Sequence, residues 1–183
     1  TALNPEFDRF NNMGLQKAIM ETEKRKKQEY RVGRNLPSWE RIEEKIPEIR
    51  KKTGDRALLR AYHFQGDNAR VVKQVEALEN NDFKAFLDMV VESGYSSYMY
   101  NQNIFDVVHK DEQVVSLGLA LSEMVLKGSG AWRVHGGGFG GTIQAFVPQE
   151  KLDEYVEVLE HVYGKGTCHK LFIRSKGSIK LDL

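Results

Sequence analysis

Apolar residues recur every three to four positions through most of the first two thirds of the chain, a spacing that predicts amphipathic helices. The pattern is clear over 83–96, directly after Asp82, a residue type that caps helix N-termini. Another helix is predicted over 111–127. The side chains expected to face the core are Phe83, Phe86, Leu87, Val90 and Val91 in the first helix, and Val114, Val115, Leu117, Leu121, Met124 and Val125 in the second.

Weaker helical patterns precede these two helices. One long helix is predicted over 55–79, interrupted or loosened near Gly66. A shorter helix is predicted over 38–49, where Pro47 is expected to kink it or stop it early. Gly54 ends that segment, as glycine commonly does at helix C-termini.

The pattern changes from helix to strand after Gly128. Short strands are predicted over 131–135 and 142–147, followed by an amphipathic helix over 149–163. Two further alternating segments, 168–174 and 178–183, predict two more strands. Because short connections join strands antiparallel, we expect an α+β fold in which helices pack on one face of an antiparallel sheet. Residues 1–183 are expected to form a single domain.

Five glycines in six positions separate the first two predicted strands, in the stretch HGGGFGGT. The spacing G-x-G-x-x-G occurs here, but a dinucleotide-binding loop opens a helix and this loop opens a strand. No Gly-Lys-Ser or Gly-Lys-Thr follows, so a Walker-type phosphate loop is not indicated. Five glycines cost about 2.5–5 kcal/mol relative to alanine. We therefore expect the loop to need positive φ angles or a close neighbour; a plain turn is the alternative.

Composition narrows the function classes. The 27 lysines and arginines nearly balance the 26 aspartates and glutamates, so no whole-chain field favours nucleic acid or an anionic membrane. The basic run 24–27 is predicted to lie on a solvated helix face. The single cysteine, Cys168, fits a reducing compartment, and no segment approaches 18 uninterrupted apolar residues. We expect a soluble, cytoplasmic protein that binds neither nucleic acid nor membrane.

The glycine loop and its flanks, GAWRVHGGGFGG over 130–141, resemble the third sequence motif of galactokinases, in the GHMP superfamily of small-molecule kinases. The phenylalanine between GGG and GG distinguishes the motif from the loops of mevalonate and homoserine kinases. An upstream match keeps the galactokinase spacing without a gap, through Arg60, Ala61, Tyr62, His63, Arg70, Val71, Ala77, Leu78, Asp82, Phe83, Ala85, Phe86, Glu92 and Ser93. The resemblance runs from about Arg60 to Val147, and residues 1–59 join the domain by continuity.

The resemblance implies a two-lobed enzyme of which this chain is the ferredoxin-like C-terminal lobe. Such an enzyme transfers the γ-phosphoryl group of ATP, with Mg²⁺, to the anomeric hydroxyl of a sugar, mostly galactose. The sugar-recognition motif, the P-x-x-x-G-L-S-S-[SA] phosphate loop and the catalytic aspartate and arginine of the N-terminal lobe are not found in these 183 residues. No catalytic residue is therefore assigned here, and the isolated chain is expected to be inactive.

What the resemblance assigns to this chain is the cleft loop. The loop is implied to pack against the phosphate-binding motif of the N-terminal lobe and to help form the cleft floor. Its residues are Gly136, Gly137, Gly138, Phe139, Gly140 and Gly141.

The sequence departs from the galactokinase pattern near this cleft. His135 replaces a threonine, Thr142 replaces a cysteine, and Gly94 replaces the histidine of a Ser-His-x-Ser motif. His135, Tyr95 and Ser96 are candidates for the cleft edge. These changes leave the kinase class intact but put the identity of the sugar in doubt.

Other histidines and other function classes are weaker candidates. His63 is expected to be structural, and His161 and His169 beside Cys168 lack the spacing of a metal site, so no metal site is predicted. One alternative is a stand-alone regulatory module that binds a small ligand at the glycine loop. Another is a polyanion- or protein-binding domain built on the basic runs 24–27 and 51–52.

Overall fold

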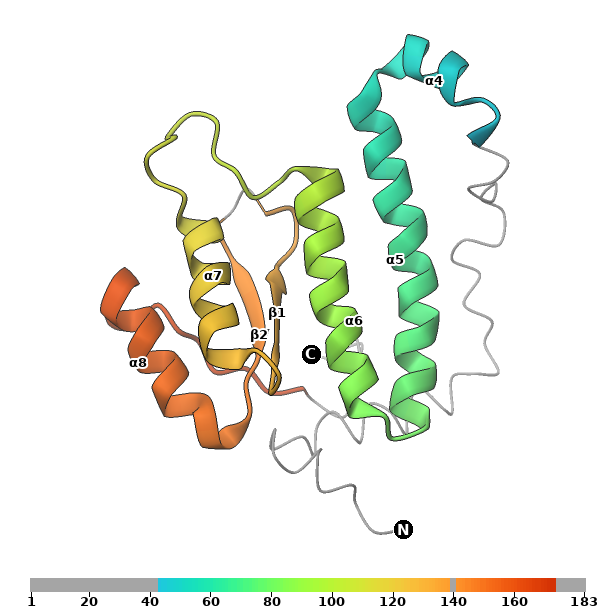
Figure 1. Ribbon diagram of the computed structural model, residues 1–183. Coiled ribbons are helices and arrows are strands. Elements are labelled where there is room, and N and C mark those ends of the chain that lie inside the picture. Colours follow the sequence, from blue (N-terminus) through green and yellow to red (C-terminus); the bar gives the residue numbers. More distant parts are fainter. Residues whose placement is uncertain (1–42, 139–140, 174–183) are drawn as a thin grey trace, which may run out of the picture.

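The computed structural model describes residues 43–138 and 141–173, which form an α+β fold (Figure 1). Its elements follow one another as helices α4 (Ile46–Thr53), α5 (Asp55–Glu79) and α6 (Phe83–Ser96), a π-helix (Ser97–Asn101), α7 (Val114–Leu126), strands β1 (Ala131–Val134) and β2 (Ile143–Phe146), a 3-10 turn (Gln149–Lys151) and α8 (Leu152–Tyr163). The α+β class predicted from the sequence is confirmed.

The helical start differs from the prediction. Pro47 lies in the first turn of α4 and so begins this helix rather than interrupting it, because proline lacks the N–H that a first turn leaves unbonded. The expected end at Gly54 is confirmed, with φ 78° and its N–H donating to the Arg50 carbonyl at 2.9 Å. The expected break near Gly66 is wrong, since α5 continues through it and the Arg70 side chain covers it.

Helix α6 begins as predicted. An Asp82 side-chain oxygen accepts the Ala85 N–H at 2.9 Å, which caps the first turn. Phe83, Leu87 and Val90 are buried together with Ala131 of β1, so the apolar stripe of α6 forms one part of the core. Near its C-terminus the helix also buries Ser93, Gly94 and Ser96, which the apolar pattern does not mark.

The predicted inward face of α7 is partly wrong. Val114, Leu117 and Met124 are exposed, Met124 to 79%. The buried residues are Val115, Gly118, Ser122, Val125 and Leu126. Because the helix is apolar almost all round, periodicity could not select its face; small residues that admit close neighbours select it instead. Gly118 lies against Ile143 and Tyr163, and Ser122 bonds the Tyr155 hydroxyl at 2.9 Å.

Strands β1 and β2 pair antiparallel, with Ala131 opposite Phe146 and Val134 opposite Ile143. Trp132 joins a core cluster with α7 and α8, Val134 joins one with α7, and Ala131 packs with α6. In Figure 1, α5 lies outside α6 and α8 outside α7, with the hairpin between the two helix pairs. The glycine loop follows the Val134–Ile143 pair and so joins the two strands at one end of the hairpin.

The last predicted elements divide between confirmation and correction. The helix expected over 149–163 is present, although its first turn is 3-10, and it ends at Gly164 as predicted. Residues 168–173 are not a strand, and Leu171 and Phe172 are exposed to 86% and 75%. Alternation makes a strand only where another strand supplies hydrogen bonds. The expected strand 178–183 lies outside the described residues. Within the described part, no helix is long and apolar enough to span a membrane.

Candidate functional site: the glycine loop and the adjacent groove

The glycine loop is closed at its base by backbone hydrogen bonds. The His135 N–H donates to the Thr142 carbonyl at 3.0 Å, and the Gly141 N–H donates to the Gly138 carbonyl at 3.1 Å. Gly136, Gly138 and Gly141 have φ values of 60°, 84° and 74°, which side-chain-bearing residues rarely adopt. Phe139 and Gly140, also expected to belong to this loop, lie outside the described residues.

The described glycines of the loop have few described neighbours on the side away from the core. A Cβ added at Gly136, Gly137 or Gly141 would meet no described atom within 4 Å. Gly137 is the informative case, because its φ is not positive and no described neighbour requires it to lack a side chain. A glycine that neither backbone conformation nor packing demands is consistent with the approach of a molecule or domain from outside these residues.

The inner side of the loop rests on Asn103, a residue the sequence analysis did not select. Asn103 is only 5% exposed, and its side-chain amide donates to the Gly137 carbonyl at 3.1 Å. The sequence carried one weak signal for it, the polar stretch Asn101-Gln102-Asn103 between two apolar helices. Its contact with the loop depends on the tertiary fold, since 34 positions separate the two residues.

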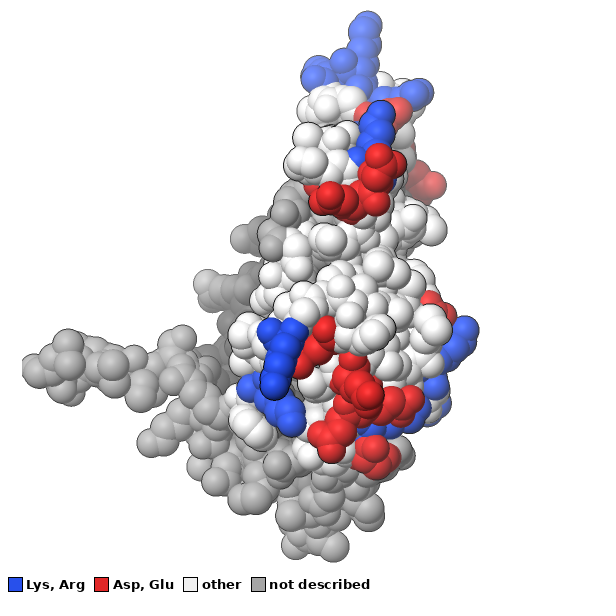
Figure 2. Space-filling model, turned by 90° about the vertical axis from the view of Figure 1, so that its left-hand side faces the viewer, with Lys and Arg blue, Asp and Glu red and all other residues white. Residues whose placement is uncertain are grey.

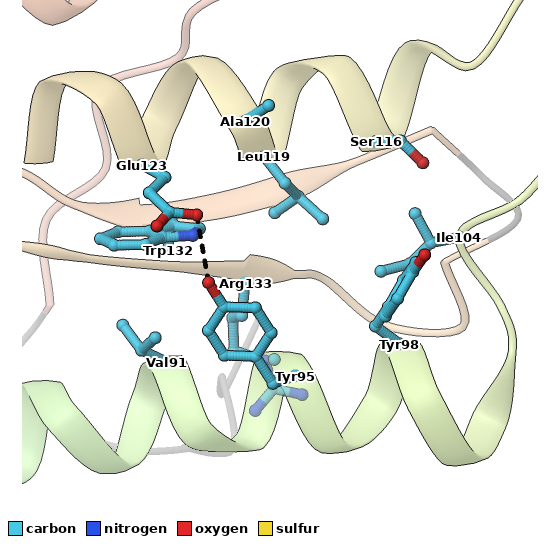
Figure 3. Close-up of a pocket in the computed structure, with 11 residues that line it drawn as sticks. Val91, Tyr95, Tyr98, Ile104, Ser116, Leu119, Ala120, Glu123, Trp132 and Arg133 are labelled. Carbon is cyan, nitrogen blue, oxygen red and sulfur yellow. Dashed lines mark hydrogen bonds between the residues drawn. The ribbon is translucent and has the colours of Figure 1, made fainter. Parts of the chain in front are cut away.

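Beside the loop, a groove of about 240 Å³ runs between α6 and α7, with β1 as its floor (Figure 3). Trp132 lies at one end, and Tyr98 and Ile104 lie at the other. Its walls are mostly apolar and aromatic, and its polar groups include Glu123 and Arg133. Such a groove can receive a small molecule with an apolar face and one or two polar groups.

The three candidates for the cleft edge are placed differently. Tyr95 lines the groove, and its hydroxyl donates to Glu123 at 3.1 Å, the dashed contact in Figure 3. Partial burial, helped by the hydrogen bond to Glu123, raises the pKa of Tyr95. His135 is exposed at the base of the loop. Ser96 is buried on the opposite side of α6, where its hydroxyl contacts His63 Nδ1 at 3.0 Å.

A partly buried polar network fixes α6 against α5 and β1. The Ser93 hydroxyl donates to Asp67 at 2.7 Å and accepts from Arg133 at 2.8 Å, so a single hydroxyl joins all three elements. Asp67 also pairs with Arg70 at 2.7 Å. Gly94 permits this approach, because a Cβ there would lie 3.0 Å from the Arg133 Cβ. The strand that leads into the glycine loop is therefore held in register by charge-assisted hydrogen bonds.

His63 belongs to the same network. Its Nε2 lies 3.2 Å from Asp67, and its Nδ1 contacts Ser96. A neutral ring that donates from Nε2 and accepts at Nδ1 satisfies both contacts. Burial is the main effect that lowers the pKa of His63, although Asp67 opposes it. These contacts lie on the far side of α6 from the groove, so His63 has a structural place here.

The described residues do not by themselves build a site for ATP and Mg²⁺. The bare glycine backbone would admit a phosphate or a second surface. The adjacent Arg133 guanidinium, however, is engaged by Ser93 and the Val134 carbonyl. No cluster of three or more histidine, cysteine, aspartate or glutamate side chains that could hold a metal occurs over 43–138 and 141–173. Around Cys168, burial raises the thiol pKa.

On the face shown in Figure 2, surface charge offers little support for the polyanion alternative. On the face in Figure 2, acidic and basic side chains stand close together and leave much of the surface uncharged. At the end of α4, Lys52 pairs with Glu48 at 2.7 Å, and Arg50 pairs with Asp55. The basic run 24–27 lies outside the described residues.

Comparison with known proteins gives one consistent relationship. The chain is 35% identical over 111 residues to a galactokinase of Haemophilus influenzae, which covers 61% of this chain and 27% of that protein. It is 30% identical over 130 residues to a galactokinase of Mannheimia succiniciproducens (71% and 32%) and 31% identical over 109 residues to one of Clostridium acetobutylicum (58% and 25%).

These matches span less than a third of each relative's length. No protein-family model matches the chain, and no solved structure matches it. Over more than half of its length, this chain is thus similar to one part of the galactokinases.

Proposed function

We propose that this chain is the C-terminal lobe of a galactokinase-like sugar kinase of the GHMP superfamily, with residues 1–183 forming one domain. The complete enzyme would convert galactose and ATP to galactose 1-phosphate and ADP. The N-terminal lobe of the same protein would hold most of the MgATP and the sugar, and would carry the catalytic groups. The isolated chain is expected to be inactive.

The observation that carries this proposal is the absence of any described neighbour around Gly137 in the glycine loop. Gly137 has neither a positive φ nor a described neighbour that would exclude a side chain, yet it is glycine. In the proposed enzyme its backbone meets the N-terminal lobe, and a methyl group there would hold the lobes apart. Similarity to galactokinases over part of their length agrees with this division into lobes.

The first test is the size of the native polypeptide, detected in source cells with an antibody against this chain. The proposal expects a polypeptide well above 21.0 kDa that phosphorylates galactose with MgATP, while the 183-residue chain alone does not. Activity of the isolated chain would overturn the division of labour. A native polypeptide of only 21.0 kDa that has no activity would overturn the kinase assignment.

A second test uses two glycines in the longer enzyme. Gly137→Ala should lower kcat/KM on the order of 10- to 100-fold without destabilising the lobe, because small displacements in an active site cost that much. Gly66→Ala, inside α5 with only the end of the Arg70 side chain nearby, is the matched control and should keep full activity. Equal activity of both variants would refute the role given to the loop.

A stand-alone small-ligand module is the second candidate, favoured by the groove between α6 and α7. Because Trp132 lies in this groove, ligand entry should change its fluorescence. With the other tryptophan removed as Trp39→Phe, saturable quenching by a sugar or nucleotide would support this function. A linear response to every compound would exclude it.

A further inference from the structure

Asn103 makes a directional contact beneath the glycine loop. Its Nδ2 donates to the Gly137 carbonyl at 3.1 Å, while its Oδ1 accepts from the Ser97 hydroxyl at 3.3 Å. A carbonyl oxygen can only accept, so the NH₂ group must face Gly137 and the amide orientation is fixed. Asn103 and Ser97 are 5% and 2% exposed, so water does not compete freely for these groups.

The loop approaches Asn103 very closely. A Cβ on Gly138 would lie 2.9 Å from the Asn103 side-chain amide and would overlap the backbone carbonyl oxygen of Asn103. Side chains are thus excluded at Gly138 by contact as well as by its positive φ. Since a Cβ on Gly136, Gly137 or Gly141 would meet no described atom within 4 Å, the described part of the loop has one side seated on Asn103 and one side without described neighbours.

Irregular backbone brings Asn103 to this position. The π-helix Ser97–Asn101 follows α6 and ends at Gln102, whose φ of 52° is left-handed. A left-handed non-glycine residue costs about 1–2 kcal/mol, and π-turns are frequent at functional sites. Asn101 reinforces the arrangement, because its side chain donates to the Ser97 hydroxyl at 3.2 Å. Local backbone strain is retained here where it orients one buried amide.

We propose that Asn103 is the positioning residue of the glycine loop. By holding the Gly137 carbonyl inward, it sets the plane of the peptide between Gly137 and Gly138. In a trans peptide the C=O and N–H point in opposite directions, so the Gly138 N–H is turned away from Asn103. Asn103 thereby presents a preset backbone surface to whatever docks there; only the identity of that occupant, the N-terminal lobe, rests on the proposed function.

Hydrogen exchange of the loop amides in the 183-residue chain tests this role. Asn103→Ala and the isosteric Asn103→Asp, whose carboxylate cannot donate, should both accelerate exchange at His135 and Gly141 by about three- to tenfold, the equivalent of one net hydrogen bond. Exchange in α7 and α8 should not change. Asp82→Ala, which removes the cap of α6 far from the loop in sequence, controls for a general loss of stability.

Loop-specific acceleration in both variants supports the positioning role. Unchanged loop exchange, wild-type protection in Asn103→Asp, or the same pattern in Asp82→Ala overturns it. If the Asn103 variants do not fold, Ser97→Ala removes the hydroxyl that donates to the Asn103 amide oxygen and accepts from Asn101. It should give a smaller loop-specific acceleration, and no acceleration would overturn the role.

The same variants separate this inference from the kinase assignment. In the longer enzyme, Asn103→Asp should lower kcat more than it changes KM for the sugar. Acceleration of loop exchange in a protein that phosphorylates no sugar would leave the positioning role standing while the proposed function fails. If the longer enzyme phosphorylates the sugar but the Asn103 variants show unchanged loop exchange, the proposed function stands and the positioning role fails.

Discussion

Ser93 is the residue whose removal should most sharply test the packing of α6 against its neighbours. It is 3% exposed and joins Asp67 of α5 to Arg133 of β1 through hydrogen bonds of 2.7 and 2.8 Å. Ser93→Ala keeps the helix and removes only this hydroxyl. Both bonds are to charged groups, and such bonds contribute about 1.5–3 kcal/mol each.

The expected loss is reduced by the bonds that survive. Asp67 keeps its pair with Arg70, and the Arg133 Nε keeps the Val134 carbonyl at 3.1 Å. We therefore expect Ser93→Ala to lower the free energy of unfolding by about 2–4 kcal/mol, a large share of the 5–15 kcal/mol typical of a domain. Urea denaturation followed by circular dichroism measures this change.

Ser129→Ala is the matched control. The Ser129 hydroxyl makes one local bond, to the Leu126 carbonyl at 3.1 Å, so its loss should cost about 0.5–1.5 kcal/mol. If Ser93→Ala cost no more than Ser129→Ala, the network would not hold the helices and strand together. A double-mutant cycle with Asp67→Asn should also show coupling between the two positions.

Two further predictions concern buried groups. Because burial lowers the pKa of His63 below its ordinary value of 6.5, the unfolded chain binds a proton that the folded chain does not. Stability should therefore fall as the pH drops below about 6.5, and denaturation of His63→Gln at several pH values should show a shallower fall; an equal slope would contradict the assignment. For α7, Leu126→Ala should cost about 2–5 kcal/mol in thermal or urea unfolding, and Met124→Ala less than about 0.5 kcal/mol. Similar losses would mean that the buried face of α7 is misplaced.

Several elements could be predicted from neighbouring residues. Asp82 marks the start of α6, Gly164 marks the end of α8, and the glycine-rich stretch 136–141 marks the turn between β1 and β2. Each of these signals acts within a few positions, through side-chain capping of a helix or through the positive φ angles that glycine allows. The unbroken course of α5 through Gly66 shows the limit of such signals, because the cost of one glycine is small beside the packing of a long helix.

The sequence by itself determined most of the helices, the two hairpin strands β1 and β2, the α+β class and the likeness of the glycine loop to that of galactokinases, but not the state of residues 168–173, which are not a strand. Tertiary structure decided which face of α7 is buried, since that helix is apolar on almost all sides and its neighbours select the face through Gly118 and Ser122. It also decided the contacts that support the loop. Asn103 meets Gly137 across 34 positions and Arg133 meets Ser93 across 40, so no local pattern could reveal either pair.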